Sequence, residues 1–299
     1  MRGFVSKTRD LLKMLEYFQM LTTKMMSTPL LNLSYRFVYF NVRGAGELCR
    51  LTLAVSGAEW EDVRYPMALG SNGFSYGPEF QHDAKAGAFD VNMGSLPILQ
   101  VVHREENNTP RLVANLGQSH SIAKFVAVQQ GMLGRNAFEQ AKIDALYESC
   151  RDIKTQWYRT KRDRGGKQLW FSGQPETIED VAGSSTEQND TPKTLKEYCR
   201  RLEKTIAASV TAQERTVESP WCMGGPSPSL ADVAIYHLLS TPSASVLTGS
   251  VPSFFDGESD RIRQAYPPED CPRLFEVVTA VGELSVVKKW ENQRPDTFT

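Results

Sequence analysis

The sequence predicts an α/β amino-terminal domain followed by an all-helical carboxy-terminal domain. Three observations support this fold class. Residues 33–56 run from an alternating apolar strand through a glycine turn into an amphipathic helix without a linker. Further strand patterns follow this unit, and two of them are so closely linked that they must pair antiparallel. Beyond residue 137 the regular apolar spacing is helical.

The composition is typical of a globular protein. With 299 residues, 40% hydrophobic and 23% charged, the chain can bury a sizeable core, and we favour two domains over one large one. The formal net charge is −1 and the pI is about 6.5. This balance argues against nucleic acid or an anionic membrane as the main partner.

The cysteines and histidines do not form a recognisable framework. The five cysteines are widely scattered without CxxC spacing, which favours a reducing, cytoplasmic setting over a disulfide scaffold. The four histidines lie far from one another and from cysteine, so we expect no metal site. No run of about eighteen apolar residues predicts a membrane-spanning helix.

Residues 1–33 form an amino-terminal extension with two open interpretations. Its apolar residues line one helical face, and its basic residues outnumber its acidic ones. This pattern is found in mitochondrial and plastid presequences. Its two acids and sparse serine favour instead a disordered extension or a helix that lies on the body of the protein.

The first strand leads to the predicted site. Tyr35, Phe37 and Tyr39 alternate with their neighbours, so they share one face of a strand. A turn with Gly44 and Gly46 follows, and a helix begins at Glu47. Tyr39 therefore lies near the carboxyl end of the strand, where ligands bind in open α/β sheets.

The rest of the amino-terminal domain follows in order. Residues 60–65 alternate as a second strand, parallel to the first because a helix connects them. Residues 66–90 predict a surface excursion with one helical piece near 78–85. A third strand at 96–102 and a fourth at 111–114 predict an antiparallel hairpin.

A helix at 118–129 then closes this domain, with Ser119 placed near its start as a cap. This order of elements is a thioredoxin-like layout over residues 34–130. Pro97 agrees with it, because a proline at the entrance of a strand can be cis and can face a site. The backbone of Leu96 would then be able to pair with a ligand.

The carboxy-terminal domain, 137–299, is predicted to be helical. A long helix spans 137–157, and a second spans 194–210 with Thr194 and Glu197 at capping-box spacing. The charged, glycine-rich stretch 161–191 predicts a partly disordered insertion. Residues 241–268 predict a second loop-rich stretch.

Several segments resemble one family. YRFVYFNVRGAGELCRLTLAVSG, MGSLPIL and QSHSIAKFVA resemble, in this order, the amino-terminal domain of cytosolic glutathione transferases, most closely the sigma class. In the other half, SLADVAIY resembles the family's capped helix, where Ser229 and Asp232 would form the capping box. CPRLFEVVTAVGELSVVKKWENQRP resembles its closing helix and tail. Together these segments cover roughly half of the chain.

The resemblance implies a catalytic role for Tyr39. In this family a tyrosine hydroxyl donates a hydrogen bond to the sulfur of glutathione, and by motif position that residue is Tyr39. The thiolate is the nucleophile, whereas a free thiol with a pKa of about 8.5 is mostly protonated at neutral pH. The alternative is a tyrosine that only fills the core.

The resemblance also implies the glutathione-binding residues. Gln118 and Ser119 match the motif that holds the γ-glutamyl carboxylate at a helix start, where free N–H groups favour anions. Leu96, before Pro97, would pair through its backbone with the cysteinyl part of the tripeptide. The alternatives are an ordinary helix cap and an ordinary strand entrance.

The sequence departs from the family at three places. Ala45 replaces the arginine that follows the glycine turn, so a contact that helps to hold or activate the thiol is lost. The loop that usually carries a tryptophan and a lysine for the glycyl carboxylate offers only Phe80 and Lys85 as substitutes. At the third place, the acid that a partner subunit supplies in this family would fall near Arg151 or Asp152, and the register between these two stays open.

We therefore expect a homodimeric, detoxifying glutathione transferase with glutathione as co-substrate, a hydrophobic electrophile and no metal. The electrophile site would lie between the domains, walled by Tyr39 and the 137–157 helix. Tyr147, Trp157 and Tyr158 are candidates for its lining, although their helical spacing favours a core role. Two alternatives stay open: a glutathione-dependent isomerase resembling prostaglandin D synthase, and a catalytically silent binding or structural relative.

Overall fold

A computed structural model of the chain describes residues 33–70, 73–104, 109–162, 194–210, 219–240 and 259–295. The amino-terminal extension lies outside these residues, apart from its last position. Most of the predicted insertion at 161–191 and much of the predicted loop at 241–268 also lie outside them.

The amino-terminal part is a mixed four-stranded sheet in the order β2-β1-β5-β6. The strands are β1 (Leu33–Phe40), β2 (Trp60–Tyr65), β5 (Ile98–Arg104) and β6 (Pro110–Gly117). β1 pairs parallel with β2 and antiparallel with β5, and β5 pairs antiparallel with β6. The predicted thioredoxin-like α/β domain is thus confirmed, although β5 and β6 extend further along the chain than predicted.

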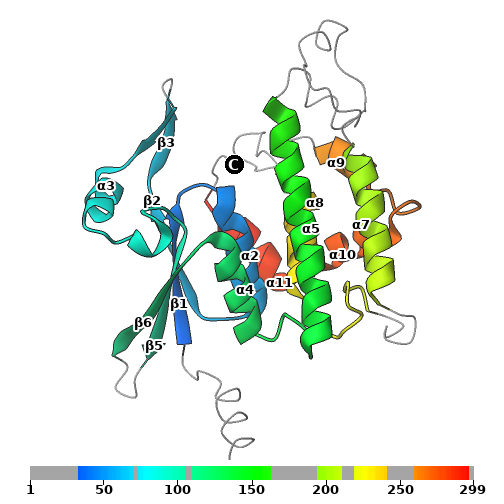
Figure 1. Cartoon of the computed structure of the whole chain (residues 1–299), viewed down its shortest axis with the longest axis horizontal. Coiled ribbons are helices and arrows are strands. Elements are labelled where there is room, and N and C mark those ends of the chain that lie inside the picture. Colours follow the sequence, from blue (N-terminus) through cyan, green and yellow to red (C-terminus); the bar gives the residue numbers. More distant parts are fainter. Residues whose placement is uncertain are drawn as a thin grey trace, which may run out of the picture.

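Two helices cover one face of this sheet. α2 (Glu47–Ser56) follows the short 3-10 turn η1 (Gly44–Gly46), and α4 (Ser119–Gln129) follows β6. Figure 1 shows α2 and α4 between the sheet and the helical part of the chain. The side chains of Tyr35, Phe37 and Tyr39 are buried on this face, as the alternation in β1 predicts.

The predicted surface excursion at residues 66–90 contains more regular structure than expected. β3 (Met67–Gly70) and β4 (Gly73–Tyr76) form a separate antiparallel hairpin, and α3 (Pro78–Lys85) confirms the helical piece. The hairpin was missed because each strand has only four residues and ends in glycine at the turn. These elements lie on the side of the sheet away from the carboxy-terminal helices (Figure 1).

The carboxy-terminal part is helical, as predicted. Its helices are α5 (Ala137–Arg162), α7 (Leu195–Ser209), α8 (Leu230–Leu239), α9 (Ser259–Ala265), α10 (Pro272–Glu283) and α11 (Ser285–Gln293). α9 lies within the stretch that the sequence predicts to be loop-rich. The predicted single closing helix is instead two helices, α10 and α11, which meet at Leu284.

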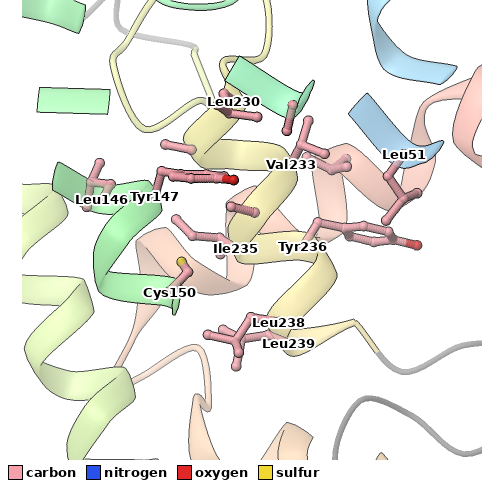
Figure 2. Close-up of a cluster of buried hydrophobic side chains, with 14 of the residues drawn as sticks. Leu51, Leu146, Tyr147, Cys150, Leu230, Val233, Ile235, Tyr236, Leu238 and Leu239 are labelled. Carbon is pink, nitrogen blue, oxygen red and sulfur yellow. The ribbon is translucent and has the colours of Figure 1, made fainter. Parts of the chain in front are cut away.

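α8 is the centre of the helical core. It contacts α5, α10 and α2, and almost every one of its side chains is buried. Figure 2 shows Tyr147 and Cys150 of α5 beside Ile235 of α8, with Leu51 of α2 on the other side of α8. Because one helix contacts elements of both parts of the chain, the main hydrophobic core is shared by the two parts.

The start of α8 is fixed by a buried carboxylate. Asp232 is fully buried and accepts hydrogen bonds from the N–H and hydroxyl of Ser229, at 2.7 and 2.6 Å, and from the N–H of Cys222 at 2.7 Å. The predicted capping box at Ser229 is therefore present. The box predicted at Thr194 and Glu197 also caps α7.

The two parts of the chain are joined by a buried ion pair between α2 and the end of α11. Glu47 is 3% exposed and accepts hydrogen bonds from Arg294 Nη1 at 2.6 Å and from Trp290 Nε1 at 3.2 Å. The Trp290 ring also packs against Trp60 of β2. These contacts hold the last described helix on the amino-terminal domain.

We predict that Glu47→Gln destabilises the protein by about 3 kcal/mol or more, because it removes the negative partner of the buried Arg294 guanidinium. The measurement is chemical denaturation. The matched control is Glu61→Gln, which breaks the ion pair between Glu61 and Arg36. The side chains of this pair are 61% (Glu61) and 47% (Arg36) exposed. The control should cost about 1 kcal/mol or less. Equal losses in the two variants would contradict the structural role of Glu47.

We also predict a pH dependence that originates at Glu47. Burial alone would raise the pKa of this carboxyl, but Arg294 and Arg50 outweigh burial and hold the pKa below its ordinary value. The contribution to stability is therefore complete above about pH 4.3, the pKa of an unfolded glutamate, and is lost as the pH falls through the lower folded-state pKa. Thermal unfolding below about pH 5 should show a steeper loss for the wild type than for Glu47→Gln.

Candidate active site

Tyr39 is held between β1 and the turn that follows it. Its side chain is 9% exposed and packs against the rings of Phe37 and Phe40. The guanidinium of Arg50 lies 5.5 Å from the centre of the Tyr39 ring. Arg50 is itself fully buried, so these contacts leave the ring one position.

The glycines of η1 let the ring lie directly against the turn. A Cβ at Gly46 would lie 2.5 Å from Tyr39 Cδ1, and one at Gly44 would lie 2.8 Å from the Tyr39 hydroxyl. Gly44 also has a φ of +40°, a backbone conformation that residues other than glycine rarely adopt. Between them, the N–H of Ala45 donates a hydrogen bond to the Tyr39 hydroxyl at 3.2 Å.

This environment keeps the phenol protonated. Burial raises the pKa of Tyr39, and the opposing effects of the Ala45 N–H and the Arg50 guanidinium are smaller. Since the hydroxyl oxygen already accepts from Ala45, its own proton can be donated to another acceptor. The chemical capacity of this group at neutral pH is that of a hydrogen-bond donor.

Leu96 and Pro97 lie at the entrance of β5, and their peptide bond is cis. The first ladder pair of β5 with β1 is Ile98 with Val38, so Leu96 precedes the paired part of the strand. Leu96 packs against hydrophobic residues on both faces of the sheet.

Asn92 connects this segment to the start of α4, a connection that the sequence analysis missed. Its Nδ2 donates to the carbonyl of Pro97 at 3.0 Å, and its Oδ1 accepts from the N–H of Gln118 at 3.1 Å. Gly117 permits the close approach, because a Cβ there would lie 2.6 Å from Asn92 Cβ. Asn92 thus sets the spacing between two predicted glutathione-binding segments.

Gln118 and Ser119 occupy the start of α4, but not in the roles expected for helix capping. Gln118 is the N-cap residue, with a φ of +66° and no side-chain cap, and Ser119 is the first helical residue. The prediction that Ser119 caps the helix is therefore wrong. The Ser119 carbonyl accepts from the Cys49 thiol at 3.1 Å.

Phe80 and Lys85 are not brought together with the Tyr39 hydroxyl. Phe80 lies in an aromatic cluster on the opposite face of the sheet, with ring-centre distances of 4.8 Å to Phe40 and 5.2 Å to Phe89. Lys85 is exposed in the last turn of α3.

A cleft of about 290 Å³ opens beside α5, and we call it the α5 cleft. Its lining residues come from the turn after β1 and from α2, α4, α5 and α8: Ala45, Leu48, Ser119, His120, Tyr147, Cys150, Arg151, Lys154, Thr155, Tyr158, Ala234, His237 and Leu238. Two of the three aromatics proposed from the sequence, Tyr147 and Tyr158, are among them. The third, Trp157, is fully buried in the core.

Tyr39 is not itself a lining residue of the α5 cleft. Ala45 is, and its N–H is the group that contacts the Tyr39 hydroxyl. The phenol therefore lies immediately behind the turn that forms one wall of the cleft. Ser119, at the start of α4, reaches the same cleft, so two predicted site segments converge there.

Both histidines of the cleft have lowered pKa values. Burial and the Arg151 guanidinium lower the pKa of His120, whose Nδ1 lies 2.5 Å from the Tyr147 hydroxyl. Burial, with Lys154 as the next cause, lowers the pKa of His237 to about 3. At neutral pH both imidazoles are uncharged.

Among the described residues, no group of His, Cys, Asp or Glu is placed to hold a metal ion, and no helix is long and apolar enough to cross a membrane. All five cysteines are buried free thiols. Burial raises the pKa of Cys49 to about 12 and that of Cys150, which lines the cleft, also to about 12, so neither thiol is a nucleophile at neutral pH.

No protein-family model matches the chain. Among curated proteins, it is 25% identical over 214 residues to S-crystallin 2 of Octopus vulgaris, which covers 70% of this chain and 81% of the relative. It is 24% identical over 271 residues to glutathione S-transferase 1 of Ascaris suum, covering 88% and 98%. It is 30% identical over 123 residues to probable glutathione S-transferase 5 of Caenorhabditis elegans, but this match covers only 41% of the chain and 49% of that relative.

Solved structures show the same fold. The monomeric Na-GST-3 of Necator americanus superposes with a TM-score of 0.54 at 19% identity, covering 88% of this chain and 98% of that one. A Nu-class transferase of Haemonchus contortus gives a TM-score of 0.52 at 19% identity, covering 89% and 100%. The chain is therefore similar in sequence to glutathione S-transferases and to an S-crystallin, and it shares the fold of the solved transferases.

Proposed function

We propose that the protein is a glutathione transferase that activates glutathione as a thiolate through Tyr39. The observation that supports this proposal most directly is the state of the phenol. Burial keeps Tyr39 protonated, and the Ala45 N–H occupies the hydroxyl oxygen as an acceptor at 3.2 Å. The hydroxyl proton is then available to donate a hydrogen bond to the sulfur of an incoming thiolate.

The required energy is within the reach of this one contact. To lower the thiol pKa by about two units, the site must favour the anion over the thiol by about 2.7 kcal/mol. A hydrogen bond to a charged group contributes about 1.5–3 kcal/mol in proteins. The buried surroundings of Tyr39 strengthen such a bond, because little water competes for the donor.

Glutathione would lie across the strand ends that Asn92 connects, between the Leu96–Pro97 segment and the start of α4. The γ-glutamyl carboxylate would meet the start of α4 at Gln118 and Ser119, where backbone N–H groups and the helix dipole favour an anion. The cysteinyl part would pair with the backbone of Leu96 beyond the sheet ladder. The thiol would then reach the Tyr39 hydroxyl, and the electrophile would enter from the α5 cleft.

Three observations favour a second candidate, a glutathione-binding protein without turnover. Ala45 stands where the resembled enzymes have an arginine, and Tyr39 is only 9% exposed. Relatives named S-crystallin also occur among the curated matches. Retention on immobilised glutathione followed by a conjugation assay with chlorodinitrobenzene separates the two candidates, because retention without turnover supports the silent protein.

We also propose a homodimer in which α5 supplies an acid to the partner's glutathione. Asp152 is exposed on α5, as such a role requires. Sedimentation of the wild type beside Asp152→Asn would separate the oligomeric state from a contribution to glutathione affinity.

We predict that Tyr39→Phe raises the pKa of bound glutathione by about one to two units, since it removes the hydrogen bond to the thiolate. The measurement is thiolate absorbance as a function of pH in the glutathione complex. Tyr35→Phe is the matched control, because Tyr35 is buried on the same face of β1 but packs against Phe125. An unchanged thiol pKa in a Tyr39→Phe protein that still binds glutathione would refute the mechanism.

We predict that Ser119→Ala weakens glutathione binding by about tenfold while the pKa of the bound thiol stays the same. The reason is that the hydroxyl contacts the carboxylate end of the tripeptide and not its sulfur. Because Ser119 does not cap α4, the substitution should leave the melting temperature unchanged. Ser121→Ala, at an exposed position of the same helix, is the control, and titration calorimetry measures both. Equal affinities in the two variants would exclude Ser119 from the site.

A further inference from the structure

Gln118, the residue before α4, has a backbone conformation that needs support. Its φ is +66° and its ψ is 116°, a combination that residues other than glycine rarely adopt. Such a strained conformation persists only where the surrounding structure holds it. The residues that the structure describes give α4 no side-chain cap, and the Gln118 side chain is exposed. The support therefore comes from contacts to the Gln118 backbone.

Asn92 makes the contact that holds this backbone. Its side chain is 4% exposed, and its Oδ1 accepts a hydrogen bond from the N–H of Gln118 at 3.1 Å. Its Nδ2 donates to the carbonyl of Pro97 at 3.0 Å, so the donor and the acceptor of the amide are both used. Gly117 lets the amide lie against the backbone, because a Cβ there would lie 2.6 Å from Asn92 Cβ. One buried amide thus fixes two segments relative to each other.

The turn that carries Asn92 is itself anchored. In and after η2 (Asp90–Asn92), the N–H groups of Asn92 and Gly94 both donate to the Phe89 carbonyl at 2.9 Å. Phe89 is 3% exposed, and its ring stacks on Phe80 with a ring-centre distance of 5.2 Å. The aromatic cluster on the far face of the sheet therefore holds the turn, and Asn92 is a fixed reference point for the start of α4.

The hydrogen bond from Gln118 to Asn92 also decides which N–H groups of α4 can meet a ligand. The Gln118 N–H is occupied, and the Gln118 carbonyl accepts the first helical hydrogen bond, from the N–H of Ile122 at 2.9 Å. The N–H groups of a helix before this point have no partner within the helix. In α4 these are the N–H groups of residues 119–121. Their direction follows from the orientation of Gln118.

We propose that Asn92 is a positioning residue that couples the two ends of the glutathione site. Its contact with Gln118 aims the first N–H groups of α4 and the Ser119 hydroxyl at the γ-glutamyl carboxylate. Its contact with Pro97 holds the Leu96 backbone in place for the cysteinyl part. Asn92 itself does not contact the ligand. This inference rests on the proposed function and deepens it, because it names the residue that makes both ends of the tripeptide bind as one unit.

The physical reason is preorganisation. A ligand that is already held at one end loses little further entropy on binding at the other end, provided that the two subsites have a fixed spacing. Without the Asn92 amide, Gln118 relaxes from its strained conformation, and the start of α4 has to be ordered again when the ligand binds. The loss therefore appears as weaker binding of the whole tripeptide and as a weaker contribution of Ser119.

The test is a double-mutant cycle on glutathione affinity, measured by titration calorimetry. Asn92→Leu removes both hydrogen bonds at similar volume and should raise the dissociation constant about tenfold. Ser119→Ala weakens binding about tenfold in the wild type, but in the Asn92→Leu background it should weaken binding about threefold or less. Additive losses would overturn the positioning role of Asn92. Asn92→Ala repeats the cycle if the leucine side chain disturbs the turn.

A conservative variant provides the rescue. Asn92→Asp keeps the oxygen that accepts from the Gln118 N–H, so it should retain most of the effect of Ser119→Ala. Loss of this effect in Asn92→Asp, to the level of Asn92→Leu, would contradict the contact with Gln118 as the cause.

A matched variant controls for a general loss of stability. Thr52→Val removes a buried hydroxyl that donates to the Leu48 carbonyl at 2.7 Å within α2. It should lower the melting temperature, yet leave glutathione affinity and the effect of Ser119→Ala unchanged. If Thr52→Val reduces the effect of Ser119→Ala as Asn92→Leu does, Asn92 has only a structural role.

The wild type separates failure of this inference from failure of the proposed function. If it binds glutathione and lowers the pKa of the bound thiol, additive losses in the cycle overturn the role of Asn92 alone. If it does not bind glutathione, both proposals are wrong. Amide hydrogen exchange without ligand is a further readout, because exchange at Gln118 should speed up in Asn92→Leu and not in Thr52→Val. Unchanged exchange would show that Asn92 does not hold the start of α4.

Discussion

The buried guanidinium of Arg50 is the constraint on which the site depends. It donates to the carbonyls of Phe40 and Val42, at 3.1 and 2.7 Å, and to Asp62 Oδ1 at 3.0 Å. These bonds hold the end of β1 as the chain leaves the sheet, and Arg50 also lies over the Tyr39 ring. A buried charge is stable only with such partners, so the position of the Tyr39 phenol and the hydrogen bonding of Arg50 are coupled.

α2, the helix that carries Arg50, also joins the two parts of the molecule. Glu47, one turn before Arg50 in α2, accepts from Arg294 and Trp290 at the end of the chain. Glu47 and Arg50 both project from α2, the helix that begins at the glycine turn. One wall of the α5 cleft is therefore built on a rigid element. Under the proposed function, this rigidity would hold an electrophile at a fixed distance from the glutathione thiol, which is what orientation contributes to catalysis.

The two faces of the sheet pack against different elements. Tyr39 faces the helices, behind the turn that forms one wall of the α5 cleft, whereas Phe40, the next residue, faces the aromatic cluster of Phe80 and Phe89. Asn92 then connects the cis Leu96–Pro97 segment with the start of α4 across the strand ends. Burial lowers the pKa of both cleft histidines, so the two imidazoles are uncharged at neutral pH.

Local sequence determined the elements and the candidate tyrosine. Alternation in β1, the glycine turn, the proline at the entrance of β5 and the capping boxes at Thr194 and Ser229 depend on neighbours within a few residues, so they could be predicted. The four-residue strands β3 and β4, the role of Asn92 and the convergence of Lys154 with His120 and His237 could not. These depend on residues far apart in the chain, and only packing of α2, α4, α5 and α8 brings them together. Burial, which sets both the protonated state of Tyr39 and the lowered pKa of Lys154, is likewise a property of the folded molecule and not of any local pattern.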